Sequence, residues 1–255
     1  MMGRTHALTG WCAGLALAPT IGATTVHQAV AFAATTAGYA LLPDLDHPGA
    51  RASKLLGPIT KALSWLLRKA SAGLYQLTKG PRDERVKGTH RHLSHTFLFA
   101  ALMGLAALYG TRAGGWYAVA GVVLFGVVLA ADALGDWLLL VAGAVTAWWA
   151  FTADVDGELE QLTGWLGVAV AAGCVTHCLG DAITEHGCPF LFPLPIAGET
   201  WYEVRPPSFL RFRTGKRVEN QVLFPVFVVL GVLLVPGVWA TIMHLFEHPV
   251  TQAGN

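Results

Sequence analysis

Long apolar runs, separated by short polar interruptions, dominate the chain. Their Ala-, Gly-, Val- and Leu-rich composition predicts membrane-embedded helices at 7–22, 26–42, 96–110, 116–132, 137–151, 164–180 and 222–244. Several runs are shorter than the roughly 20 residues that an α-helix needs to cross a bilayer. We therefore expect an all-α polytopic membrane helix bundle with about seven segments, some of them half-buried or re-entrant.

Composition agrees with this pattern. The chain is 54% hydrophobic and 13% charged, whereas a typical soluble domain is about 25% charged. Mean hydropathy is +0.50. The four cysteines show neither a disulfide framework nor a CxxC pair. We expect residues 1–255 to form one membrane-embedded domain whose main partner is the lipid bilayer.

A basic stretch interrupts the apolar runs. Residues 47–95 hold ten of the 17 Lys and Arg residues, and we treat 48–90 as a cytoplasmic basic insertion. Its middle, ITKALSWLLRKASAGLYQL (59–77), alternates apolar and basic residues at helical spacing. This spacing predicts an amphipathic helix that either lies along an anionic membrane surface or packs on the rest of the domain as a solvated helix.

The distribution of charge also predicts an orientation. A second basic stretch lies at 205–217, whereas 113–204 contains neither Lys nor Arg. Basic loops are enriched on the cytoplasmic side. We therefore expect an inner (plasma) membrane protein with 47–95 and 205–217 in the cytoplasm.

Polar residues of unusual type stand at the predicted cytoplasmic ends of these segments. His177 and Asp181 are four residues apart, which places them on one face of a helix. Asp44 and Asp46 flank a leucine after a proline, so an extended segment would direct both carboxylates to one side. Taken alone, each pair has a structural interpretation, as a His–Asp hydrogen bond or as a helix cap or turn.

These motifs suggest a metal site because they share one end of the bundle. The full candidate set is His6, Asp44, Asp46, His90, His95, His177, Asp181 and Glu219. His47 is a neighbour that could either bind the metal or support its ligands. Carboxylates gathered without a cation would repel one another. Ligation by His, Asp and Glu without thiolates favours Zn²⁺, Mn²⁺ or Fe²⁺. The ligands exceed the four of one tetrahedral ion, which leaves room for two or more ions.

The same residues carry a resemblance to a known family. The motifs are TH (5–6), LLPDLDHP (41–48), HRHLSHT (90–96), HCLGDAITEHGCPFLFP (177–193) and FRTGKRVEN (212–220). In this order the chain resembles the YdjM-like membrane-bound metal-dependent hydrolases. That family is distantly similar to zinc-dependent phospholipase C and related nucleases. His92 departs from the family pattern, where a small residue is usual, and the stretch between Pro48 and His90 is long.

The resemblance implies roles for the candidates. The eight His, Asp and Glu residues named above would be metal ligands or catalytic groups. From their chemistry alone, Asp44, Asp46 or Glu219 could bridge metals or accept a proton from water, and Arg91 could neutralise charge on a phosphoryl group.

The resulting hypothesis is a membrane hydrolase that acts on a small-molecule or lipid substrate, such as a phosphoester or phospholipid headgroup, through metal-activated water. We expect no specific nucleic-acid partner, because a membrane surface explains the basic stretch. The alternatives are a non-enzymatic metal-binding membrane protein, such as a transporter or sensor, and a structural protein with hydrogen-bonded His and Asp residues.

Overall fold

The structure is a computed structural model that describes residues 1–255 except 24, 48, 50–56, 136–154 and 248–255. Its described part is helical and contains only isolated β-bridges, which confirms the predicted all-α class. The α-helices are α1 (Gly3–Leu17), α2 (Val26–Tyr39), α3 (Pro58–Thr78), α4 (Phe97–Leu134), α6 (Val155–Ala182), α7 (Phe224–Leu233) and α8 (Val238–Glu247). The short helices are η1 (Ala18–Ile21), η2 (Pro43–Asp46), η3 (Leu93–His95), η4 (Ser208–Leu210) and the π-helical η5 (Val218–Leu223).

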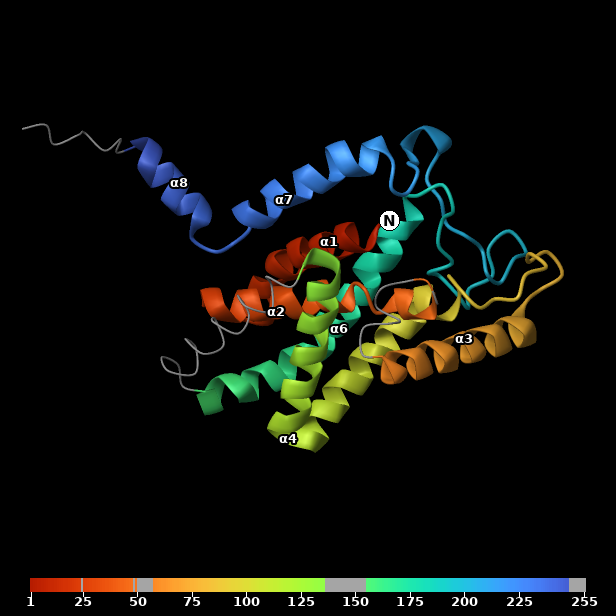
Figure 1. The fold of residues 1–255 in the computed structure, drawn as a ribbon, viewed down its shortest axis with the longest axis horizontal. Helices are drawn as coiled ribbons and strands as arrows, with labels where there is room; N and C mark the ends of the chain where they lie inside the picture. Colours follow the sequence, from red (N-terminus) through yellow and green to blue (C-terminus); the bar gives the residue numbers. More distant parts are fainter. Residues whose placement is uncertain (24, 48, 50–56, 136–154, 248–255) are drawn as a thin grey trace, which may run out of the picture.

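Helix α2 lies at the centre of the bundle and contacts α1, α4 and α6 (Figure 1). Small residues make this packing close. A Cβ built on Gly173 of α6 would lie 2.6 Å from the backbone oxygen of Thr36 and 2.8 Å from the backbone nitrogen of Ala40. The backbones of α6 and α2 therefore touch at the end of α2, as small residues allow in membrane helices. This contact fixes the position of the α2 C-terminus against α6.

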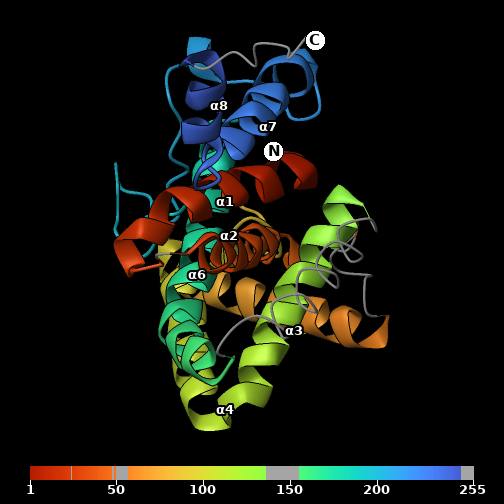
Figure 2. The ribbon, with the colours of Figure 1, turned by 90° about the vertical axis from the view of Figure 1, so that its left-hand side faces the viewer.

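Helix α4 is two arms joined at Gly115, whose φ of 58° and ψ of −149° are not helical. Positive φ favours glycine because it has no Cβ to clash with the backbone. Figure 2 shows the arms diverging from the bend at the lower end of the molecule. The segments predicted at 96–110 and 116–132 are therefore the two arms of one hairpin.

Two or three of the described helices are long enough to cross a membrane. Among the described residues, α4, taken as one helix of 38 residues across its bend, and residues 161–182 of α6 have the length and hydropathy for a span. The pair α7 and α8, bent by 80° at its break, raises the count to three. Helices α1 and α2 have only 15 and 14 residues, which agrees with the expectation that several segments are shorter than a membrane span. The segment predicted at 137–151 lies outside the described residues.

The amphipathic helix predicted at 59–77 is present as α3. Its buried residues are Thr60, Ser64, Ser71 and Tyr75, so small polar side chains and one tyrosine face the protein. Large apolar side chains such as Leu66 point away from it. The helix thus packs on the domain through its polar face and leaves its apolar face exposed.

Candidate metal centre

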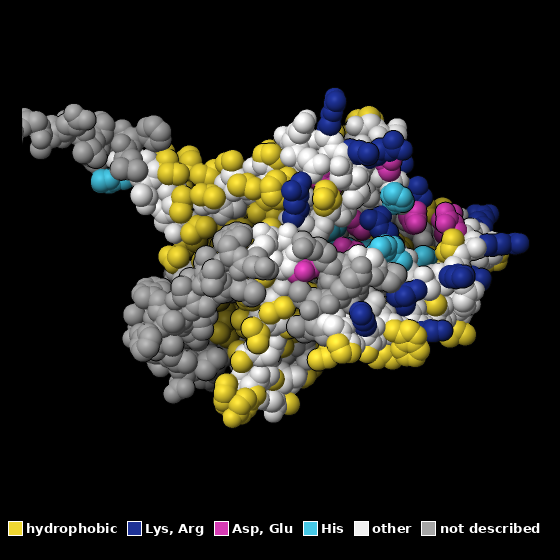
Figure 3. Space-filling view, in the orientation of Figure 1, with side chains coloured by type: hydrophobic (Ala, Val, Ile, Leu, Met, Phe, Trp, Pro, Cys, Tyr) yellow, Lys and Arg dark blue, Asp and Glu magenta, His cyan; other side chains and the backbone are white. Residues whose placement is uncertain are grey.

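The candidate ligands come from separate segments that meet at one end of the bundle. His6 lies in the first turns of α1, Asp44 and Asp46 lie in η2, and His95 ends η3 just before α4. His177 and Asp181 lie in the last turns of α6. Figure 3 shows histidine and acidic side chains together at the surface on the side where Lys and Arg side chains gather.

His177 presents a free nitrogen to this site. Its Nδ1 lies 2.8 Å from the backbone oxygen of Ala40. A carbonyl only accepts hydrogen bonds, so Nδ1 carries the proton and Nε2 of the neutral ring carries a lone pair. The close contact of Gly173 with the end of α2 places the Ala40 oxygen where His177 can reach it. Packing of α6 on α2 therefore selects the metal-binding tautomer.

His95 is oriented in the same way through Ser94. The Ser94 hydroxyl donates to Oδ2 of Asp46 at 2.6 Å and lies 2.9 Å from Nδ1 of His95. Since its only proton goes to Asp46, the hydroxyl accepts from His95, which again leaves Nε2 with a lone pair. Burial lowers the pKa of His95 to about 3, although the nearby charge of Asp46 acts to raise it. The ring is therefore neutral near pH 7.

These two nitrogens point at each other. Nε2 of His95 and Nε2 of His177 are 3.1 Å apart. Oδ2 of Asp181 lies 3.6 Å from the first and 3.7 Å from the second, and Oδ1 of Asp44 lies 3.8 Å from Nε2 of His177. Tetrahedral ligands at zinc distances of 2.0–2.1 Å stand about 3.3 Å apart. The observed spacing is close to that of a tetrahedral metal site.

His6 gives a second indication that the site is built for a cation. It stacks on His177 with ring centroids 3.8 Å apart, and its Nε2 lies 3.3 Å from Oδ1 of Asp181. Within the described chain, neither buried ring nitrogen of His6 makes a hydrogen bond. A buried polar atom without a partner is costly. A metal ion would satisfy it, so the residues present fit the metal that the motifs imply.

Asp181 is surrounded by positive groups. Arg91 Nη2 lies 2.8 Å from its Oδ2, and the amino group of Met1 contacts its Oδ1. His6, Arg91 and His177 therefore all lie around the carboxylate of Asp181, and the predicted pair of His177 and Asp181 is brought together. Two overlapping groups have ligand atoms within 4.8 Å of one another: His6, His177 and Asp181, and Asp44, His95 and His177.

Asp46 lies beside this centre and is satisfied by other partners. Its carboxylate contacts His90 Nδ1 at 2.5 Å and accepts from the backbone N–H of Arg91 at 3.0 Å, besides the Ser94 hydroxyl. Burial alone would raise the pKa of Asp46, but His95, His90 and Ser94 together hold it below its usual value. These contacts hold the 90–95 loop, and the roles of Asp46 and His90 as metal ligands, or of Asp46 as a proton acceptor, stay predictions.

Glu219 is also buried, with a different set of partners. It accepts hydrogen bonds from the backbone N–H groups of Met2 and Gly215, each at 2.6 Å. These bonds join the start of α1, which carries His6, to the beginning of η5. The role of Glu219 as a ligand or catalytic group stays a prediction.

The remaining histidines of the motifs lie toward the outside. His90 is one-third exposed and meets exposed His47 edge to face, with ring centroids 4.7 Å apart. His92 packs against Tyr75 and Trp201, and its Nδ1 donates to the backbone oxygen of His90 at 2.7 Å. The departure from the family pattern at His92 therefore has a packing role in this structure.

Among the described residues, the exposed edge of the centre is formed by Asp44 and Arg91. His6, His95, His177 and Asp181 are buried, whereas the Asp44 and Arg91 side chains are 24% and 23% exposed. Within the described part of the chain, these two side chains therefore connect the buried nitrogens with the surface. The sequence analysis did not identify Ser94 or the Ala40 carbonyl as groups that orient the histidines. For Ser94, the one signal was its place directly before His95 in the motif HRHLSHT.

Comparison with known proteins agrees with the motifs. The model of the YdjM inner membrane protein family matches residues 1–244. This chain belongs to that family. The match covers every motif that suggested the resemblance, which is thereby confirmed. No curated protein and no solved structure matches the chain. Family membership and the apolar helices together make the chain a membrane protein.

Proposed function

We propose that this YdjM family member is a membrane-bound metal-dependent hydrolase that acts on phosphoester or phospholipid-like substrates. The observation that carries the proposal is the approach of two imidazole nitrogens to 3.1 Å, each with its other nitrogen engaged as a donor. Two lone pairs at this distance repel each other unless a cation or proton lies between them. The neighbouring carboxylates of Asp44 and Asp181 favour the cation.

His95, His177, Asp44 and Asp181 would hold the ion, with His6 as a further ligand. Both ligand groups include His177, whose single free nitrogen serves one ion, so we propose one shared ion at this point. Zn²⁺ suits the nitrogen and oxygen ligands best, with Mn²⁺ and Fe²⁺ as alternatives. When bound, the ion acts as a Lewis acid and lowers the pKa of water at the site toward 7.

The protein's own residues would bind and orient the substrate. Arg91 is partly exposed beside Asp181, where its guanidinium can bind two phosphoryl oxygens and neutralise their charge. Asp46 holds His90, His95 and the Arg91 backbone in place. The buried nitrogens lie behind these groups, in a setting that limits the access of bulk water.

We propose further that the site faces the cytoplasm. The basic residues of α3 and the following loop lie on the same side of the molecule as the site (Figure 3), and such residues favour the cytoplasmic leaflet. The candidate ligands stand at helix ends, whereas transporter ligands lie near the bilayer midplane. This placement supports an enzyme over a transporter.

Metal content tests the centre itself. The purified protein should contain about one equivalent of zinc or another divalent metal by elemental analysis, and His177→Ala should lose most of it. His27→Ala is the matched control, because His27 lies at the start of α2 and contacts Thr25. Retention of full metal content by His177→Ala would refute the proposed ligand set.

Activity tests the reaction. Protein stripped by a chelator and refilled with zinc should hydrolyse an activated phosphodiester and release the headgroup of a phospholipid in mixed micelles. Refilled protein that binds metal but cleaves none of a broad set of phosphoesters would instead favour the metal-binding transporter or sensor. Metal flux in vesicles that disappears in Asp181→Ala would establish that alternative.

A further inference from the structure

Helix α3 carries an apolar surface that no described residue covers. Ile59, Leu63, Leu66 and Leu77 lie along one side of the helix with exposed fractions between 44% and 86%. Their spacing of four, three and eleven residues keeps them on one stripe of an α-helix. The opposite side packs on the protein through the small polar residues described above. An ordinary solvated helix would present the reverse arrangement.

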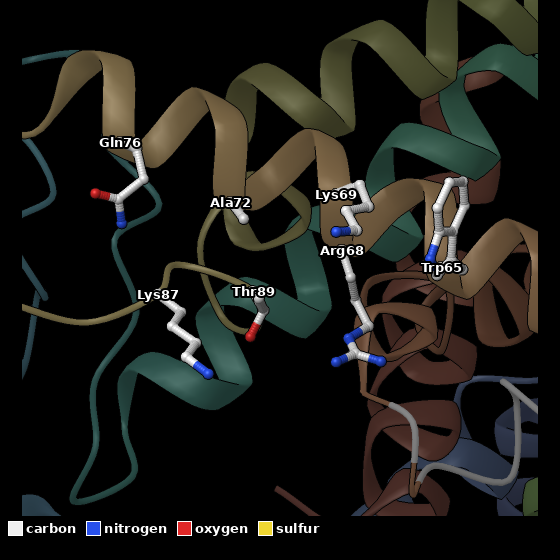
Figure 4. Close-up of a pocket in the computed structure, with 7 residues that line it drawn as sticks. All are labelled: Trp65, Arg68, Lys69, Ala72, Gln76, Lys87 and Thr89. Carbon is white, nitrogen blue, oxygen red and sulfur yellow. The ribbon is translucent and has the colours of Figure 1, made fainter.

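A third side of α3, between these two, forms one wall of a pocket of about 420 Å³. Trp65, Arg68, Lys69 and Gln76 from the helix face Lys87 and Thr89 of the following loop (Figure 4). Figure 4 shows the Lys69 amine beside the helix and the charged ends of Arg68 and Lys87 extending to the same side of it. The pocket is therefore basic and lies beside the apolar stripe.

Hydrogen bonds hold the two walls of this pocket together. The Ser71 hydroxyl donates to the backbone oxygen of Gly88 at 2.6 Å. The Tyr75 hydroxyl donates to Glu84 O at 2.5 Å, and Gln76 Nε2 donates to Val86 O at 2.9 Å. The loop thus runs beside α3 at a fixed distance, which makes the pocket a built feature of the fold.

The charges of the pocket define its ligand. No acidic residue lines it, and in the described part of the chain Arg68, Lys69 and Lys87 form no ion pair or side-chain hydrogen bond. Three free cations with one hydroxyl and one amide suit an anion with several oxygens, such as a phosphate group. The neighbouring apolar stripe suits acyl chains, and Trp65 is a residue favoured at the membrane interface.

We propose that α3 lies in the membrane interface with its apolar stripe among the acyl chains, and that the pocket binds the headgroup phosphate of an anionic phospholipid. This lipid site is separate from the metal centre and stands whether or not the protein is a hydrolase. The proposal rests on three sides of α3: the buried polar side that packs on the protein, the exposed apolar stripe, and the basic side that lines the pocket.

Lipid binding to the full-length protein tests the pocket. In neutral detergent, native mass spectrometry should show retained phosphatidylglycerol in preference to phosphatidylcholine. Arg68→Gln/Lys69→Gln/Lys87→Gln should lower the affinity for phosphatidylglycerol on the order of 100-fold, because it removes three direct charge-assisted contacts to the headgroup phosphate. The control Lys61→Gln/Lys79→Gln/Arg85→Gln removes the same charge from the same region outside the pocket and should lose much less.

Three outcomes would overturn the pocket assignment. Equal losses in the two triple variants would indicate diffuse electrostatic attraction. Equal retention of phosphatidylcholine would remove the headgroup preference. Inorganic phosphate that displaces phosphatidylglycerol at comparable concentration would indicate a free-phosphate site. A thermal unfolding temperature equal to that of the wild type would verify that each variant is folded.

A depth measurement tests the apolar stripe. The native cysteines are buried, so a fluorophore can be attached to a cysteine introduced at Leu66, Leu77 or Arg85. In nanodiscs with brominated acyl chains, the probes at Leu66 and Leu77 should be quenched strongly and the probe at Arg85 weakly. Equal quenching at the three positions, or none at Leu66 and Leu77, would refute the in-plane placement of α3.

Discussion

The hydroxyl of Ser94 controls which nitrogen of His95 faces the metal centre. It donates to Asp46 and accepts from Nδ1 of His95, and this arrangement leaves Nε2 free for an ion. In Ser94→Ala the proton of His95 loses its acceptor and can move to Nε2, where it blocks ligation. Oδ2 of Asp46 loses one donor at the same time. We therefore expect Ser94→Ala to weaken metal binding although Ser94 itself does not contact the ion.

The expected magnitude follows from the role of such outer partners. Their removal typically lowers metal affinity 10- to 100-fold, which corresponds to about 1.4–2.8 kcal/mol. The carboxylate of Asp46 keeps contacts with His90 and with the backbone of Arg91, so the fold should survive. A buried acceptor that loses one donor costs on the order of 1–3 kcal/mol of stability.

Competition for zinc against a chromophoric chelator measures this affinity, and thermal unfolding measures the stability. Ser64→Ala is the control, since it removes the same hydroxyl from another buried serine, in α3, that makes no hydrogen bond to the site within the described chain. Ser94→Ala should lose at least tenfold in zinc affinity while Ser64→Ala stays within twofold of the wild type. A folded Ser94→Ala protein with wild-type affinity would refute the tautomer argument.

Four further outcomes follow. Gly173→Ala should lower stability by about 1–3 kcal/mol in thermal unfolding, since its Cβ would lie 2.6 Å from a backbone oxygen. His92→Phe should keep wild-type zinc content, because His92 packs on aromatic rings; a loss of zinc would assign it to the centre. Arg91→Gln should lower kcat for a phosphodiester about 100-fold with zinc content unchanged, and an unchanged kcat would exclude it from catalysis. The unfolding temperature without zinc should be roughly 5–11 °C lower than with free zinc at 100 times its Kd. Equal unfolding temperatures would contradict a zinc site in the folded state.

The helical pattern could be predicted where one side of a helix differs from the other. The period of apolar residues in 59–77 gave the helix that became α3 almost to the residue. Spanning length was harder to predict, because hydropathy measures composition and not helix ends. Helices α1 and α2 are apolar but end after 15 and 14 residues, where Ala18–Ile21 and Pro43–Asp46 form short 3₁₀ helices.

The candidate ligands were visible in the sequence because imidazoles and carboxylates are rare at the ends of apolar runs. Spacing alone related His177 to Asp181, and the structure places both beside His6 and His95. The groups that orient these ligands could not be predicted. The carbonyl of Ala40 belongs to no motif, and its role depends on the approach of two backbones.

Arg91 joins two parts of the centre by different atoms. Its backbone has a left-handed φ of 57°, and its N–H is bound by Asp46 of η2, while its guanidinium reaches Asp181 of α6. The backbone of Arg91 is therefore held by one carboxylate and its guanidinium by another. A cation held by Asp181 would compete with the guanidinium for the same carboxylate, and a displaced guanidinium could bind an anion while Asp46 still holds the backbone. One residue can in this way exchange its place at the carboxylate for a place on the substrate.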